Sequence, residues 1–350
     1  MVDVIERIRV ALTAYFCQQD GESLKGLDVL GIRRRPYSAV VFLRAHTLRN
    51  ANRLVAKTII DHPWNKAFTG SRNQAVVEFK ALQFLYPKFQ EIEGCSVPRP
   101  LLVVPEMHTY IMEHVDGGLL GYKLRSARYL GSNRAFAILR NHFYHCGKWL
   151  RFLHKFTGTG TAGPESLSGA LRHCEHRLEL TEKSRKLRGV NGLRERVMSF
   201  LNDQVSQLSD ARVPIAGRHG DFHSWNILAG PQGITVIDFL DYRQDPLPLD
   251  LLKMLVHLED EKESLTSSAR RIEALRESFL LGYGELPWVP TPVVTVCEAM
   301  QRAVSLWGSI SGPKRKLHHR MEAKFRLKVH LKWLTEEVSR KSLWPSRCSS

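Results

Sequence analysis

The chain has 350 residues, of which 43% are hydrophobic and 25% are charged, the balance of an ordinary globular protein. No apolar run reaches the roughly 18 residues that a membrane-spanning helix needs. The six cysteines lie far apart and form no CxxC pair, which argues against a zinc knuckle and against a disulfide framework. These features predict a cytoplasmic protein that is large enough for two lobes.

The charge balance is less ordinary, because 51 Lys and Arg against 35 Asp and Glu give a net charge of +16. Residues 117–164 contain no acidic residue, and residues 314–333 are similarly basic. The basic side chains of the first stretch are Lys123, Arg125, Arg128, Arg134, Arg140, Lys148, Arg151 and Lys155. The charge indicates either a solvated surface or attraction to an anionic partner, such as a phosphorylated substrate, a nucleic acid or a membrane surface.

The first third of the chain is predicted to hold two helices around a set of strands. Residues 1–16 have apolar positions at helical spacing and are typical of an amphipathic helix, not of a signal peptide. Residues 24–60 contain two β-branched, apolar runs and are predicted to form strands. A helix is expected at 72–86, and the next residue, Pro87, is expected to end it.

The rest of the chain is predicted to be mostly helical. Residues 98–118 favour two short strands that run into a glycine-containing link, and residues 233–239 favour one more strand. Helices are predicted at 134–155, 172–188, 193–208, 265–283, 291–309 and 319–340. The pattern predicts an α+β fold in which a small strand-rich lobe, 1–115, precedes a larger helical lobe, 116–350.

The segment HGDFHSWNILAGPQGITVIDF, at 219–239, holds residues suited to phosphoryl transfer. That chemistry needs a carboxylate that accepts or orients the attacking hydroxyl, and oxygen ligands that hold magnesium against the phosphates. Asp221 is followed five residues later by Asn226, and Asp238 ends an apolar strand after a further twelve. A tight loop followed by a hairpin can bring the three side chains into one cleft.

This segment resembles the catalytic loop and metal-binding strand of the aminoglycoside phosphotransferase and choline kinase family. That family has an HGD-x4-N loop, then an ID-aromatic step and a DP-x-x-x-DL step, and its fold is bilobal and similar to that of protein kinases. The resemblance implies that Asp221 is the catalytic base and that Asn226 and Asp238 ligate Mg²⁺. It also implies that His219 is a structural prop of the loop and that Asp250 stands at a helix N-terminus in the C-lobe.

The resemblance extends to the N-terminal half, where a lysine must contact the α- and β-phosphates of ATP and a glutamate must hold that lysine. Leu54-Val55-Ala56-Lys57 is similar to the family's V-A-x-K signal. Glu78, on the next predicted helix, is the expected partner of Lys57. The structural alternative is that Lys57 lies on an edge strand, where its charge prevents pairing with another chain, and that Glu78 is a solvated helix residue.

The expected nucleotide loop departs from the family pattern, because no GxGxxG precedes Lys57. Residues 31–38 stand in its place and are rich in arginine, and Ser38 with backbone N–H groups could contact phosphate there. Residues 112–115 resemble the family's hinge, which implies that backbone groups of Glu113 and Val115 bind the adenine edge.

The resemblance implies Mg²⁺-dependent transfer of the γ-phosphoryl group of ATP to a hydroxyl of a small molecule. A protein kinase is disfavoured, because Asp238 is followed too soon by Asp250 for an activation segment. The alternative from another class is a pseudokinase or a scaffold that binds anionic ligands. Nucleic acid is not the expected partner, whereas contact with a membrane surface or an anionic substrate remains open.

The acceptor is the least defined part of the prediction. The family resemblance suggests an aminoglycoside or an amine alcohol such as choline or ethanolamine, which are cations. The charge of +16 instead favours an uncharged or anionic acceptor, such as a sugar, a phosphosugar or a glycan-linked intermediate. Against this, Glu259, Asp260 and Glu261 could form a local acidic patch.

Overall fold

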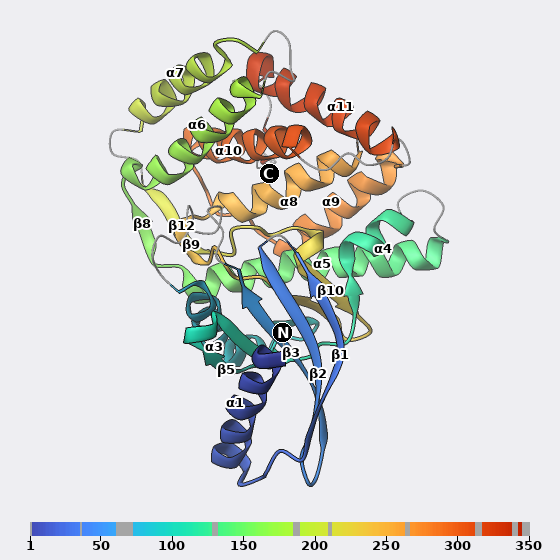
Figure 1. Ribbon diagram of the computed structural model, residues 1–350. Coiled ribbons are helices and arrows are strands. Elements are labelled where there is room, and N and C mark those ends of the chain that lie inside the picture. Colours follow the sequence, from blue (N-terminus) through green and yellow to red (C-terminus); the bar gives the residue numbers. More distant parts are fainter. Residues whose placement is uncertain are drawn as a thin grey trace. The chain divides into compact units, whose positions relative to one another are not determined.

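The computed structural model describes residues 2–35, 37–60, 73–127, 132–184, 190–208, 212–262, 267–311, 317–337 and 342–344. Contacts within the chain define two compact units. The first unit contains Met1–Leu119 and Asn226–Tyr242, and the second contains Leu120–Trp225 and Arg243–Ser350. An antiparallel sheet in the first unit and a set of helices in the second confirm the predicted α+β class (Figure 1).

The first unit is built on a five-stranded sheet in the order β1-β2-β3-β6-β5, with every neighbouring pair antiparallel. Its strands are β1 (Gly26–Arg34), β2 (Ser38–His46), β3 (Ala51–Ile59), β5 (Pro100–Val104) and β6 (Thr109–Glu113). Lys57 lies on β3, between β2 and β6. The alternative that placed Lys57 on an edge strand is therefore wrong.

One face of this sheet is covered by α1 (Val2–Asp20), which confirms the predicted amphipathic N-terminal helix. Its buried side chains Ile8, Leu12 and Phe16 share a hydrophobic core with strand residues that include Leu54 and Ala56. Because successive side chains of a strand point to opposite faces, Val55 and Lys57 point to the other face of the sheet.

Helix α3 (Gln74–Phe89) follows β3 and differs from the prediction at its C-terminus. Pro87 lies inside the helix, which continues to the buried Phe89. A proline in the last turn removes only one backbone hydrogen bond, and the burial of Phe89 compensates for that loss. Glu78 is fully buried on this helix. The predicted start at Arg72 lies outside the described residues.

A second, four-stranded sheet in the first unit has the order β4-β11-β10-β7. Its strands are β4 (Cys95–Ser96), β7 (Gly118–Leu119), β10 (Ile227–Gly230) and β11 (Gly233–Val236). Strands β10 and β11 form the predicted antiparallel hairpin, and the N–H of Ile237 donates to the carbonyl of Asn226 at 3.0 Å. Asn226 and Asp238 therefore stand at the open end of the same hairpin.

The second unit is mainly helical. Its described helices are α4 (Leu120–Ala127), α5 (Asn133–Thr157), α6 (Ser168–Lys183), α7 (Leu193–Ser206), α8 (Pro248–Lys262), α9 (Ala269–Tyr283), α10 (Thr291–Ser311) and α11 (Leu317–Lys332). A small sheet pairs β9 (Val213–Arg218) with β8 (Gly160–Ala162) and β12 (Arg243–Pro246). Across the described ranges, no helix has both the length and the hydropathy that a membrane crossing requires.

Most of the predicted helices are present, with shifts of a few residues at their ends. The predicted helix at 319–340 is present as α11, which ends at Lys332 and is followed by a π-helical turn, Trp333–Glu337. The predicted end at 338–340 lies outside the described residues. Helices α5 and α9 touch through their backbones: a Cβ on Gly282 would lie 1.8 Å from the carbonyl oxygen of Tyr144, and one on Gly147 would lie 1.9 Å from that of Phe279. Two glycines therefore fix this helix pair.

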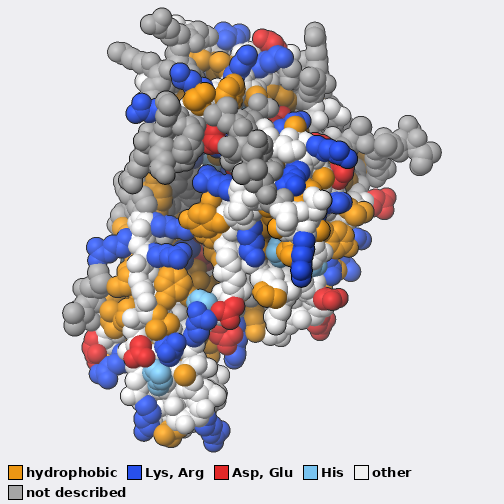
Figure 2. Space-filling view, turned by 90° about the vertical axis from the view of Figure 1, so that its right-hand side faces the viewer, with side chains coloured by type: hydrophobic (Ala, Val, Ile, Leu, Met, Phe, Trp, Pro, Cys, Tyr) orange, Lys and Arg blue, Asp and Glu red, His pale blue; other side chains and the backbone are white. Residues whose placement is uncertain are grey.

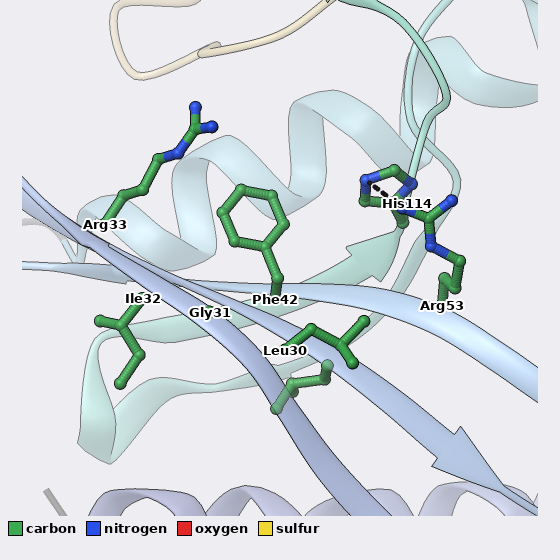
Figure 3. A pocket seen from close by; sticks show the side chains of 8 residues that line it. Leu30, Gly31, Ile32, Arg33, Phe42, Arg53 and His114 are labelled. Carbon is green, nitrogen blue, oxygen red and sulfur yellow. Dashed lines mark hydrogen bonds between the residues drawn. The ribbon is translucent and has the colours of Figure 1, made fainter.

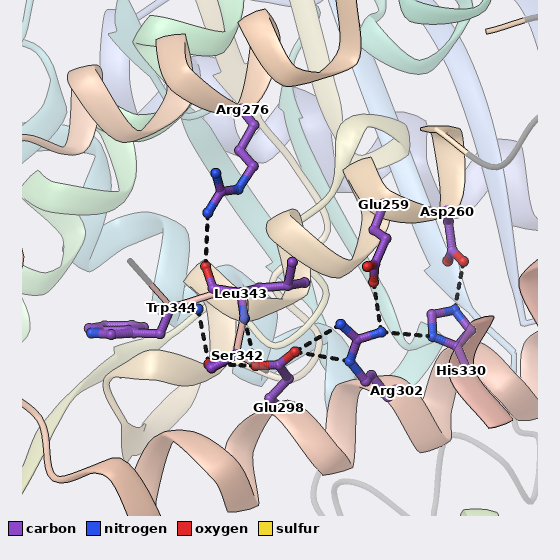
Figure 4. A network of polar contacts seen from close by, with 9 residues as sticks. All are labelled: Glu259, Asp260, Arg276, Glu298, Arg302, His330, Ser342, Leu343 and Trp344. Carbon is purple, nitrogen blue, oxygen red and sulfur yellow. Dashed lines mark hydrogen bonds and ion pairs between the residues drawn. The ribbon is translucent and has the colours of Figure 1, made fainter. Parts of the chain in front are cut away.

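The acidic run 259–261 takes part in a network of ion pairs inside the second unit (Figure 4). Arg302, only 2% exposed, contacts Glu259 at 2.6 Å and Glu298 at 2.9 Å. His330 contacts Asp260 at 2.7 Å, and Arg326 contacts Glu261 at 3.4 Å. Each carboxylate of the run therefore has a basic partner. Elsewhere, Lys and Arg side chains are spread among hydrophobic ones over much of the face in Figure 2.

Candidate active site

A buried lysine on β3 lies between two carboxylates of the first unit. The Nζ atom of Lys57 donates to both carboxylate oxygens of Glu78, each at 2.9 Å, and to Oδ1 of Asp238 at 2.9 Å. The Lys57 side chain is 10% exposed and that of Glu78 is fully buried. The ion pair of Lys57 with Glu78 that we predicted from the sequence is confirmed, and Asp238 joins it.

The charges of this group are mutually dependent. Burial lowers the pKa of Lys57, but Asp238 and Glu78 raise it more, so the pKa lies above its ordinary value and the ammonium stays charged. Burial also raises the pKa of Glu78, and Lys57 opposes this shift. The carboxylate of Glu78 further accepts the N–H of Phe239 at 2.9 Å and a hydrogen bond from Tyr110. Glu78 is thus fixed by three groups besides its own helix.

Asp238 and Asn226 are the two residues predicted from the sequence to ligate Mg²⁺. Asp238 adopts a left-handed φ of 74°, which is uncommon for a residue other than glycine, and its side chain is 34% exposed. Asn226 is 6% exposed. Carboxylate and amide oxygens are hard ligands that suit Mg²⁺, which usually takes its other ligands from phosphates and water. In the described part of the chain, no group of three or more His, Cys, Asp or Glu could hold a metal ion by itself.

The region of the expected nucleotide loop lines a cavity of about 380 Å³ in the first unit. Its lining residues are Leu30, Gly31, Ile32, Arg33, Phe42, Leu43, Arg53 and His114 (Figure 3). The guanidinium of Arg33 lies 5.4 Å from the centroid of the Phe42 ring, and His114 meets that ring edge-on at 6.1 Å. Burial and the neighbouring Arg53 lower the pKa of His114, so its ring is neutral at physiological pH.

The predicted hinge residues Glu113 and Val115 directly precede and follow His114, which lines this cavity. The N–H of Glu113 donates to the carbonyl of Arg99 at 2.9 Å, and the N–H of His114 donates to the carbonyl of Arg53 at 2.9 Å. The predicted contact of Glu113 with a base would therefore use its carbonyl oxygen. Val115 follows β6 in an irregular segment, and Ser38 begins β2.

In the second unit, each carboxylate oxygen of Asp221 contacts a basic side chain. Nε2 of His223 lies 3.0 Å from Oδ2, and Nζ of Lys253 lies 3.0 Å from Oδ1. Partial burial raises the pKa of Asp221, but His223 and Lys253 outweigh it, and the pKa lies well below its usual range. Asp221 is therefore ionised throughout the physiological pH range, and its side chain is 50% exposed.

Asp250, in the first turn of α8, fixes the backbone of the loop that carries Asp221. The buried carboxylate of Asp250 accepts the backbone N–H groups of His219 and Gly220. Gly220 has a φ of 92°, which glycine adopts without strain. The fully buried ring of His219 accepts the N–H of Asp221 at 3.3 Å and packs edge-on against Trp149. These contacts suit the propping role that we expected for His219 and Asp250.

Sequence reasoning did not single out His223, Lys253 or Trp225. Lys253 stands three residues after Asp250, so one turn of α8 presents both side chains to the same loop, and this spacing was a usable signal. Trp225 precedes Asn226, and Gly121 packs against it so closely that a Cβ would lie 2.6 Å from the indole ring. Arg125 lies 4.6 Å from the same ring centroid.

Comparison with solved structures shows the same fold at low sequence identity. A glucosamine kinase has 13% identity and a TM-score of 0.57, with 90% of this chain and 95% of that chain covered. A glucosamine kinase in complex with glucosamine, ADP and inorganic phosphate has 13% identity and a TM-score of 0.53, with coverages of 91% and 96%. A putative aminoglycoside phosphotransferase from Ralstonia eutropha JMP134 has 13% identity and a TM-score of 0.56, with coverages of 95% and 98%.

Comparison with curated protein sequences gives no match. Comparison with protein families gives one match, the phosphotransferase enzyme family (APH), over residues 65–291. This range includes Glu78, Asp221, Asn226, Asp238 and Asp250. Since the match spans more than half of the chain, the protein belongs to the phosphotransferase enzyme family and is a small-molecule kinase of that family.

Proposed function

We propose that the protein transfers the γ-phosphoryl group of ATP, with Mg²⁺, to a hydroxyl of an uncharged or anionic small molecule, with sugars and phosphosugars as the acceptor class. The observation that carries this proposal is the environment of Asp221. One of its carboxylate oxygens contacts the ammonium of Lys253, and the other contacts the imidazole of His223.

In the first unit, Lys57 would bind the α- and β-phosphates of ATP. Glu78 holds the lysine in place from the buried side and keeps it charged. Asp238 and Asn226 would hold Mg²⁺, which supplies positive charge against the phosphate oxygens during transfer. Because Oδ1 of Asp238 already contacts Lys57, the lysine also sets the orientation of this carboxylate.

The nucleotide base would enter the cavity lined by Phe42 (Figure 3). The Phe42 ring and the neutral His114 ring offer stacking surfaces, and the cation of Arg33, beside the same Phe42 ring, would contact a phosphate of the nucleotide. The carbonyl of Glu113 and backbone groups of Val115 would bind the base edge. Ser38, with the backbone around it, would contact phosphate in place of the missing glycine-rich loop.

Asp221 would orient the attacking hydroxyl and accept its proton. Its low pKa makes it a weak base, so proton transfer would come late, after the bond to phosphorus is largely formed. Most of its contribution is then positional, and the contacts with His223 and Lys253 hold the carboxylate in one orientation.

The charge around Asp221 favours an acceptor that is not a cation. Lys253 is only 15% exposed and lies where an acceptor hydroxyl must approach the carboxylate. The acidic run 259–261, which could have formed a site for a cation, has each carboxylate paired with Arg302, His330 or Arg326. An aminoglycoside or a choline-type alcohol would therefore meet repulsion that a sugar or phosphosugar does not.

A magnesium–ATP turnover assay against a panel of acceptors tests this proposal. The panel holds neutral hexoses and hexose phosphates on one side and the cations choline, ethanolamine and kanamycin on the other, and Asp221→Asn is the control for contaminating kinases. We expect turnover with a sugar or sugar phosphate that disappears in Asp221→Asn. Efficient turnover of choline or kanamycin, with none of any sugar or phosphosugar, would contradict the acceptor class. No ATP turnover with any acceptor would favour a pseudokinase.

A further inference from the structure

Helix α5 carries an exposed face that the proposed chemistry does not use. Leu139, Phe143, Cys146, Leu150 and Leu153 are buried on the opposite side. Apart from Phe152, which follows Arg151 directly, the outward residues stand three or four positions apart, and we call the whole set the α5 stripe. The α5 stripe consists of Arg134, Ile138, Asn141, Tyr144, Lys148, Arg151, Phe152 and Lys155, all exposed or half-buried.

The α5 stripe is strongly cationic. The whole helix contains no acidic residue, and neither does any position from 117 to 164. No ion pair to a described carboxylate is found for Arg134, Arg151 or Lys155, in contrast to the paired arginines of α10 and α11. From Arg134 to Lys155 the helix rises by about 30 Å, at about 1.5 Å per residue. The α5 stripe therefore presents a straight row of positive charge.

Apolar side chains stand among these cations. Ile138 is 51% exposed and Tyr144 is 37% exposed. Leu281 on α9, which is 72% exposed, adjoins them in the fold, because its neighbour Gly282 packs on the backbone of Tyr144. The Nζ atom of Lys155 lies 5.8 Å from the centroid of the Phe152 ring. Cations and large apolar groups thus share one surface.

This combination distinguishes between anionic partners. Binding to a nucleic acid backbone requires cations but gives no stabilisation to exposed Ile and Leu side chains. Surfaces that lie on membranes combine Lys and Arg, which attract anionic headgroups, with Leu, Ile and aromatic side chains, which enter the acyl boundary. A straight and acid-free row also suits a planar partner.

We propose that the α5 stripe, together with Leu281, docks the protein on a membrane surface that contains anionic lipids. The cations would contact lipid phosphates, and Ile138, Tyr144 and Leu281 would enter the interface between headgroups and acyl chains. The helix keeps its buried face in the second unit, so docking requires no unfolding. This inference does not rest on the proposed phosphoryl transfer.

Co-sedimentation of the full-length protein with vesicles tests the inference. One vesicle preparation is phosphatidylcholine alone, and the other contains about a third phosphatidylglycerol, at low ionic strength. We expect binding to the anionic vesicles only. Replacing Arg134, Arg151 and Lys155 by Gln should lower the partition coefficient roughly 100-fold, since each cation near an anionic surface contributes about fivefold.

A matched control removes the same charge elsewhere. Lys25, Arg44 and Lys80 are exposed in the first unit, and their joint replacement by Gln changes the net charge equally. This control should bind vesicles as the wild type does. A second variant, Ile138→Asn with Leu281→Asn, keeps the net charge and should still weaken binding. Both positions are at least half exposed, so circular dichroism and Tm should stay unchanged.

Three results would overturn the inference. The first is that the wild type fails to sediment with anionic vesicles. The second is that the two triple-Gln variants lose equal affinity, which would mean unspecific attraction by the net charge. The third is that a single-stranded oligonucleotide binds in a way that depends on the α5 stripe while vesicles do not, which would assign the surface to nucleic acid.

Discussion

Removal of the Lys57 charge tests the buried part of the site most directly. Lys57→Met keeps the approximate volume of the side chain but leaves the carboxylate of Glu78 without its cation. Glu78 has no exposed surface, so water cannot replace the lost contact. Breaking a buried ion pair on one side costs about 3–5 kcal/mol. Asp238 loses the same partner at a smaller cost, because it is 34% exposed and remains hydrated.

The pH dependence of this loss has a definite sign. Burial and, less strongly, Asp238 raise the pKa of Glu78, whereas Lys57 and, less strongly, Tyr110 lower it, so the loss of Lys57 raises this pKa further. A carboxyl whose pKa is raised on folding contributes stability below its unfolded pKa and loses it as the pH rises through the folded pKa. Lys57→Met should therefore lower the Tm more at about pH 8 than at about pH 5.5.

The double variant Lys57→Met with Glu78→Gln removes the unpaired charge. The amide oxygen of Gln can still accept the N–H of Phe239, so this variant should recover most of the lost Tm. Thermal unfolding of the wild type, both single variants and the double variant gives the coupling energy. Additive losses in the double variant, or an equal Tm loss at both pH values, would refute the argument.

The remaining predictions concern catalysis. Asp221→Asn should lower kcat at least about 100-fold while calorimetry shows unchanged ATP binding, and retention of more than about a tenth of kcat would exclude Asp221 as the base. Asp238→Asn should move the midpoint of a magnesium titration of activity to higher concentration, and an unchanged midpoint and rate would remove Asp238 from the metal site. Lys253→Gln removes a cation that lowers the pKa of Asp221, so the acidic limb of the pH profile of kcat/KM should move to higher pH. An acidic limb at the wild-type pH would show that Lys253 does not lower the pKa of this carboxylate.

The elements that sequence reasoning recovered depend on short-range patterns. The β10–β11 hairpin follows from apolar runs on both sides of a Pro-Gln-Gly turn, and α1 and α5 follow from their helical periodicity. The ion pair of Lys57 with Glu78 could be predicted because only one described carboxylate stands on the helix after β3. The assignment of roles to these residues still rests on the family and remains a proposal.

The features that escaped prediction depend on contacts between distant segments. Strands β4 and β7 have two residues each and exist because β11 and β10 pair with them, which no local pattern indicates. Pro87 was expected to end α3, but the burial of Phe89 outweighs the local preference. The contact of Lys253 with Asp221 depends on the register of α8, which Asp250 sets through the backbone of the loop.

The division of the chain into units has a consequence for biosynthesis. The first unit is not complete at Leu119, because β10 and β11, which pair with β7 and β4, belong to Asn226–Tyr242. At about 5–20 residues per second, a ribosome needs roughly 6–25 s to extend the chain from Leu119 to Tyr242, where the first unit ends. During that time the growing chain carries Lys57 and Glu78 but not yet Asp238. Four described helices of the second unit, α4 to α7, are synthesised before the four-stranded sheet of the first unit can form. The four-stranded sheet, which Lys57 and Glu78 need in order to meet Asp238, is therefore the part of the first unit that forms last during synthesis.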